Sequence, residues 1–127
     1  MKHFPTFFAL QDRPVVVVGG SAMALQRVRL LLQAGARIAL FARTLDPALA
    51  ELVLDGALRW QAQSAREADF AGTALVFVAT GDAAEDAVAA GLARAAGVPV
   101  NVVDRPELCD FIMPAIVERG PVTIGIS

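Results

Sequence analysis

Short runs of hydrophobic residues alternate along the chain with longer segments that have helical periodicity. The apolar runs predict strands at 14–18, 37–42, 75–79 and 100–103, with weaker candidates at 57–62 and 122–126. Helical spacing and end signals predict helices at 22–34, 47–54 and 82–96. Strands that are apolar almost throughout, with helices between them, indicate a parallel sheet that is covered on both faces.

We therefore predict a single α/β domain with a doubly wound, Rossmann-type parallel sheet and the strand order 3-2-1-4-5-6. A length of 127 residues fits one domain. Residues 105–120 are expected to form the longest irregular connection, and long loops in compact domains are often functional. Asp46 and Asp82 are expected to cap the helices that follow them.

The amino-acid composition argues against several classes of protein. A hydrophobic content of 56% with 19% charged residues argues against disorder, and a net charge of −2 without a basic stripe argues against nucleic-acid binding. The apolar runs are too short to span a membrane, and the N-terminal stretch lacks a cleavage site for secretion. A single cysteine and a single histidine exclude an internal disulfide and a Cys/His metal cluster, which fits a cytoplasmic protein.

The turn after the first predicted strand is a G-x-S-x-x-A variant of the dinucleotide-binding G-x-G-x-x-G/A pattern. Gly19 would make the tight turn and Ala24 would let the helix pack closely on the strand. Ser21 stands where a glycine normally lets the backbone approach the pyrophosphate, although its hydroxyl can donate to a phosphate. The plainer interpretation is a Gly-Gly pair that ends a buried strand, but the strand, helix and strand around it favour a dinucleotide site.

Two further candidates follow other strands. Arg43 and Thr44 come after the second strand, where NAD-binding sites often carry an acidic residue for the ribose; Arg43 can instead contact a 2′-phosphate, so NAD and NADP both stay open. Asp104 follows the fifth strand, where a carboxylate can take a proton beside a bound cofactor. Its plainer role is a turn before Pro106.

Four separated blocks of sequence resemble one known family. Pro5, Phe7, Leu10 and Arg13 match its opening P-x-F-x-x-L-x-x-R pattern, and "VVGG" with "RLLLQAGA" follows. "VFVATGD" and then "NVVD", Pro106 and "FIMPAIV" complete the match in order and at the family's spacing. The chain resembles the N-terminal domain of siroheme synthase and its stand-alone relatives, the precorrin-2 dehydrogenase/sirohydrochlorin ferrochelatases.

This resemblance implies NAD-dependent oxidation of precorrin-2, a tetrapyrrole, to sirohydrochlorin, with insertion of ferrous iron in some members. It implies that the pyrophosphate lies on the turn, at Gly19, Gly20, Ser21, Ala22 and Met23. It also implies that Arg43 and Thr44 line the adenosine side of the cofactor and that Thr80 lies beside the cofactor crevice. Asp104 matches the aspartate assigned to dehydrogenation and metal insertion. No permanent protein metal site is implied, since the macrocycle's nitrogens hold the metal.

The chain also departs from the family. Ser21 replaces the third glycine of G-G-G, and residues 25–27 are less charged than usual. The family's helical segment, which forms a homodimer and walls the tetrapyrrole pocket, is expected to lie outside these residues. These departures leave open a non-catalytic dinucleotide-sensing module, and Arg43 alone leaves open a generic NADP reductase. Arg105 and Arg119 are candidates to pair with substrate carboxylates, or they are solvated arginines.

Overall fold

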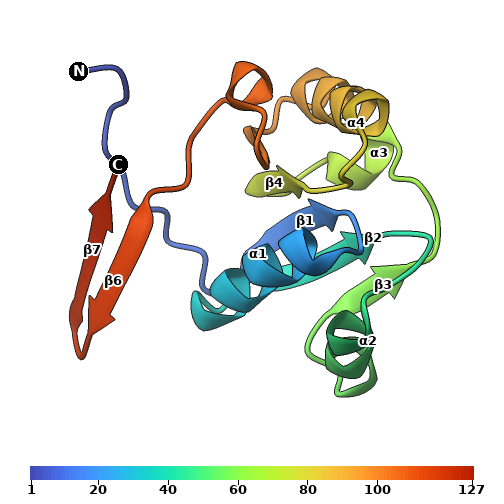
Figure 1. Ribbon diagram of the computed structural model, residues 1–127, viewed down its shortest axis with the longest axis horizontal. Coiled ribbons are helices and arrows are strands. Elements are labelled where there is room, and N and C mark those ends of the chain that lie inside the picture. Colours follow the sequence, from blue (N-terminus) through green and yellow to red (C-terminus); the bar gives the residue numbers. More distant parts are fainter.

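Five parallel strands form the sheet at the centre of the computed structural model, which describes all residues 1–127 (Figure 1). Their order across the sheet is β3-β2-β1-β4-β5. The strands are β1 (Pro14–Val18), β2 (Arg37–Phe41), β3 (Arg59–Gln61), β4 (Leu75–Val78) and β5 (Val100–Val102). The predicted α/β class and the predicted order of these five strands are confirmed.

Helices follow the strands in the alternation that the sequence predicts. They are α1 (Ala22–Gln33), α2 (Pro47–Leu54), α3 (Glu67–Phe70) and α4 (Ala83–Ala95), with a 3₁₀ turn at Pro106–Leu108. The short helix α3 was not predicted from the sequence. Asp46 and Asp82 cap α2 and α4, because their carboxylates accept from the N–H groups of Ala48 at 3.0 Å and Glu85 at 2.9 Å. None of the helices has the length and hydrophobicity that crossing a lipid bilayer requires.

Alternate residues of each strand supply two separate hydrophobic cores, one on each face of the sheet. Val15 and Val17 of β1 pack in the core beneath α1 and α2, whereas Val16 and Val18 pack in the core beneath α3 and α4. Strand β1 is therefore buried on both sides, which explains its uninterrupted run of valines. The order of the strands reverses between β1 and β4, and ligands of doubly wound sheets bind outside the carboxyl ends of the strands at this point.

The prediction that residues 122–126 form a sixth strand of the main sheet is wrong. β7 (Val122–Ile126) pairs antiparallel with β6 (Ala115–Arg119) in a separate hairpin, which projects from the sheet in Figure 1. A two-residue turn joins the strands, and Gly120 supplies the positive φ of 56° that such turns favour at their first position. Residues 115–119 of the connection expected to be irregular are thus regular strand.

The loop between β5 and this hairpin is anchored on the sheet by an aromatic contact. The Phe111 ring meets the Phe77 ring edge to face, with centroids 5.5 Å apart and planes at 86°. The amide of Asn101, which is buried in β5, donates to the Phe111 carbonyl at 3.0 Å. These contacts hold the end of the loop against β5.

Candidate functional site

The turn after β1 passes unusually close to two neighbouring loops. Gly19 has a φ of +126°, and a Cβ atom there would lie 2.1 Å from the Ala79 carbonyl oxygen. A Cβ atom on Gly20 would lie 1.9 Å from the Thr44 carbonyl oxygen. Both glycines are therefore required by the crossing of three backbone segments at the carboxyl edge. This crossing places the start of α1 beside the ends of β2 and β4.

The first turn of α1 presents free hydrogen-bond donors. Ser21, the N-cap residue, has an extended backbone, an exposed side chain and no side-chain cap hydrogen bond. The first intrahelical bond runs from the Leu25 N–H to the Ser21 carbonyl at 3.0 Å, so the N–H groups of residues 22–24 have no acceptor within the protein. No acidic residue lies in this turn. The amides and the positive end of the helix dipole together suit an anionic group.

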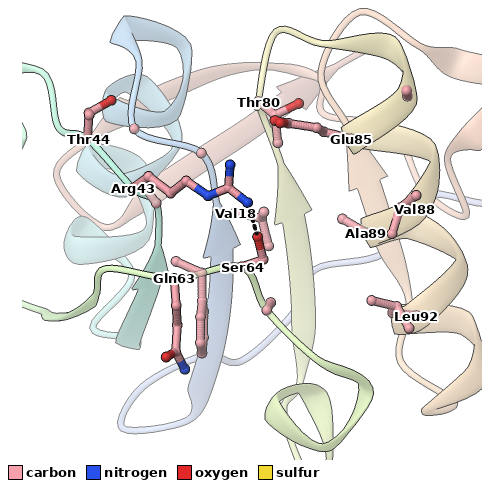
Figure 2. A pocket seen from close by; sticks show the side chains of 16 residues that line it. Val18, Arg43, Thr44, Gln63, Ser64, Thr80, Glu85, Val88, Ala89 and Leu92 are labelled. Atoms are coloured by element: carbon pink, nitrogen blue, oxygen red, sulfur yellow. Dashed lines mark hydrogen bonds between the residues drawn. The ribbon is translucent and has the colours of Figure 1, made fainter.

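A cavity of about 500 Å³ opens at this edge of the sheet, within the range of small-molecule sites. It lies at the point where the strand order reverses, between the loop after β2 and helix α4 (Figure 2). Five predicted cofactor-binding residues line it, namely Gly19, Gly20, Arg43, Thr44 and Thr80. Three others, Ser21, Ala22 and Met23, do not line the cavity and lie in the first turn of α1 next to it.

Polar side chains line both sides of the cavity, since Glu85 lies on the α4 side opposite Arg43. The Arg43 guanidinium reaches toward Ser64 and donates from Nη2 to its hydroxyl at 3.3 Å (Figure 2). The loop that carries Arg43 is held by the Trp60 indole, which donates to the Ala42 carbonyl at 2.8 Å. Across the cavity, α4 contributes an apolar surface that includes Val88 and Leu92. Such a cavity suits a ligand with one polar end and one flat apolar part.

Asp104 lies directly after β5 at the same carboxyl edge, but it does not line the cavity. It is exposed and has a φ of 62°, which an aspartate tolerates better than most residues. Its turn is closed on both sides: the Val103 N–H donates to the Val78 carbonyl at 2.9 Å, and the Arg105 N–H donates to the Val102 carbonyl at 3.2 Å. The carboxylate is thus exposed beyond the carboxyl end of β5.

One buried carboxylate in this region was missed in the sequence interpretation. Asp86, in the first turn of α4, is only 2% exposed. It accepts hydrogen bonds from Thr80 and forms an ion pair with Arg105, with 2.8 Å between Nε and Oδ2. Arg105 is therefore not a freely solvated arginine, and the hydrogen bond to Asp86 raises its pKa. An acidic residue in a helix's first turn gave no sign in the sequence that it would be buried and paired.

Arg119 and the single cysteine, Cys109, do not line the cavity. Arg119, the second candidate partner for substrate carboxylates, lies exposed at the end of β6 in the projecting hairpin. Cys109 is partly buried, and its sulfur lies 3.2 Å from both the N–H and the carbonyl of Val102. It helps to fasten the loop after β5 to the strand.

Comparisons with known proteins agree with this architecture. Residues 6–115 match the family model NAD_binding_7, described as "Putative NAD(P)-binding". The whole chain is 46% identical to siroheme synthase 1 of Cronobacter sakazakii and 41% identical to siroheme synthase of Methylococcus capsulatus, over 127 residues in each case. It spans 27% of the length of each of these relatives.

A solved structure shares the fold. The chain superimposes on "SirC, precorrin-2 dehydrogenase" with a TM-score of 0.79 and 27% sequence identity, over 98% of this chain and 61% of that one. The chain accordingly belongs to the family NAD_binding_7, and the resemblance to siroheme synthases and precorrin-2 dehydrogenases that was expected from the sequence is confirmed.

Proposed function

We propose that this protein catalyses the NAD-dependent oxidation of precorrin-2 to sirohydrochlorin. The observation that carries the proposal is the carboxyl edge of the sheet, where a cavity and the free amides of α1 lie on one side and Asp104 lies past the end of β5. The relatives' names support the substrate, since a siroheme synthase and a precorrin-2 dehydrogenase act in tetrapyrrole chemistry. The cytoplasm is the proposed compartment, because a lone cysteine fits a reducing environment.

The residues present fit a dinucleotide. The N–H groups of residues 22–24 have no acceptor of their own and would hold the pyrophosphate, with the exposed Ser21 hydroxyl beside them. Arg43 and Thr44 would line the adenosine end, and Thr80 the crevice end. NAD is the proposed cofactor. NADP is the alternative, because Arg43 can contact its 2′-phosphate. When bound, the nicotinamide supplies a hydride acceptor.

The protein's own contribution is orientation and proton transfer. Oxidation removes a hydride from a carbon of the macrocycle and a proton from the same substrate, so a base must stand near the cofactor. The Asp104 carboxylate is exposed and held in a closed turn, and it would accept this proton. The apolar wall of α4 would exclude water from one side of the cavity.

Iron insertion is a further part of the proposal. Ferrous iron would enter as a substrate and be held finally by the four macrocycle nitrogens, while Asp104 would accept protons that leave those nitrogens. A homodimer completed by the family's helical segment would close the tetrapyrrole pocket. Both points rest on the family resemblance and not on the cavity.

A non-catalytic dinucleotide-sensing module is the second candidate. Two observations favour it: Ser21 occupies the third position of the turn, and Asp104 lies outside the lining of the cavity. A sensing module would bind NAD without oxidising a tetrapyrrole.

Mixing the protein with NAD and precorrin-2 distinguishes the two candidates. The proposal predicts that NADH and sirohydrochlorin appear together and in equal amounts, as followed by their absorbance. Nucleotide binding without either product would support the sensing module and reject the enzyme.

A further inference from the structure

Asp86 is the most buried charged side chain of the chain, and its burial calls for an explanation. Its side chain is 3% exposed, although it lies in the first turn of a helix where an acidic residue usually meets solvent. A buried carboxylate is costly unless hydrogen bonds and a counter-charge compensate it. Both kinds of partner are present, and they come from two different segments of the carboxyl edge.

The first oxygen of Asp86 holds the segment after β4. Oδ1 accepts from the Thr80 N–H at 3.1 Å and from the Thr80 hydroxyl at 2.5 Å. Thr80 lines the cavity in which we place the cofactor. This pair of bonds therefore fixes the backbone and the side chain of a cavity residue at once.

The second oxygen holds the segment after β5. Oδ2 accepts from Nε of Arg105 at 2.8 Å, and the Arg105 side chain is 31% exposed. Arg105 is the residue next to Asp104, and its N–H closes the turn that gives Asp104 its positive φ. Holding the Arg105 side chain therefore limits the movement of the Asp104 turn.

We infer that Asp86 is a positioning residue that holds the turn of Asp104 through Arg105 while it orders Thr80 at the cofactor cavity. The inference rests on the proposed role of Asp104. A helix-capping role alone would not account for the geometry, because Asp82 already caps α4 and Asp86 makes its bonds outside the helix. The two oxygens act on different sites, so substitutions can separate them.

Two single variants and their double variant test the ion pair between Asp86 and Arg105 separately from the bonds to Thr80. Asp86→Asn keeps an oxygen for Thr80 and loses the charge that pairs with Arg105, whereas Arg105→Ala removes the partner. Because misplacement of a reacting group slows the chemical step more than binding, we expect kcat for precorrin-2 oxidation to fall about tenfold in each. The dissociation constant for NAD should stay within about twofold, and the double variant should be no slower than the slower single variant.

Rescue and a matched control complete the kinetic test. Arg105→Lys keeps a charge near Asp86 and should recover part of kcat. Arg37→Ala removes an exposed arginine that donates to the Asp12 carbonyl at 2.9 Å, at the opposite end of the sheet from the cavity, and should leave kcat unchanged. Equal losses in kcat and NAD affinity, additive losses in the double variant, or losses that only follow the unfolded fraction would overturn the inference.

A second measurement does not depend on the enzymatic proposal. In backbone ¹⁵N relaxation, the order parameters of residues 104 and 105 should fall from about 0.85 toward 0.6 in Arg105→Ala. The order parameters of these two residues in Arg37→Ala should match those of the unchanged protein. If the unchanged protein fails to oxidise precorrin-2, the proposed function fails, and this measurement then decides whether the pair fixes the turn. Unchanged order parameters would reject that positioning.

Discussion

Gly19 passes so close to Ala79 that a Cβ atom on Gly19 would lie 2.1 Å from the Ala79 carbonyl oxygen. This approach is between the ends of β1 and β4, where the strand order reverses. The glycine at the start of the motif is thus required by the protein's own backbone, independently of any ligand. A glycine pattern of this kind therefore indicates that backbone segments cross at the strand ends, and it does not by itself indicate a nucleotide site.

The first prediction concerns Gly19→Ala. The added methyl group meets a backbone carbonyl, and φ is +126°, so we expect a loss of more than about 3 kcal/mol in the free energy of unfolding. Gly91→Ala is the matched control, because Gly91 lies inside α4 with open space around its Cβ position. That change should stabilise the protein by about 0.5–1 kcal/mol. Urea denaturation measures both, and equal effects at the two positions would contradict the account.

Ser21→Gly tests the departure at the third position of the turn. Ser21 makes no cap hydrogen bond, so its replacement should change the stability by only a few tenths of a kcal/mol. Removal of the Cβ lets the backbone come closer to a pyrophosphate, and NAD should bind about threefold more tightly. Isothermal titration gives the dissociation constant. Weaker binding after the change would mean that the hydroxyl itself holds the phosphate.

Arg43→Ala tests the choice between NAD and NADP. Arg43 donates only to Ser64 at 3.3 Å and is free to turn toward a 2′-phosphate. We expect the dissociation constant for NADP to rise about tenfold and that for NAD to change less than about twofold. Arg29→Ala, on the exposed side of α1, should change neither. Equal effects on the two nucleotides would place Arg43 away from the 2′ position.

Asp104→Asn removes the proposed base without altering the backbone. Asparagine tolerates a φ of 62° as aspartate does, so the melting temperature and NAD affinity should stay close to those of the unchanged protein. Precorrin-2 oxidation should slow at least about 100-fold. Asp12→Asn is the control, because Asp12 has a φ of 60° but precedes β1 at the other end of the sheet. Undiminished oxidation by Asp104→Asn would remove Asp104 from the chemistry.

Local pattern predicted most of the fold. The valine run of β1 and the aspartate–proline start of α2 gave their elements with the observed bounds, because burial on both faces and a cap are properties of adjacent residues. The pairing of strands, in contrast, depends on residues that are distant in the sequence. β7 has a strand's alternation, but its partner is the segment across Gly120 and not the edge of the sheet. The Gly-Pro pair at 120–121 between two apolar runs was the available sign of a hairpin.

The candidate site was predictable where one turn carries it. Gly19 and Gly20 lie at the cavity because the end of β1 fixes them there. Asp86 was not predictable, since its burial depends on Thr80 and Arg105 arriving from two other strand ends. These three residues are far apart in the sequence, and they become neighbours only through the order of the strands in the sheet.

The most direct test of the central claim is a titration of the ¹⁵N-labelled protein with NAD, followed by the chemical shifts of its amides. The account predicts that the largest shifts occur at residues 19–23, with further shifts at Thr44 and Thr80 along the cavity. An absence of shifts at millimolar NAD, or shifts confined to the opposite end of the sheet, would contradict it.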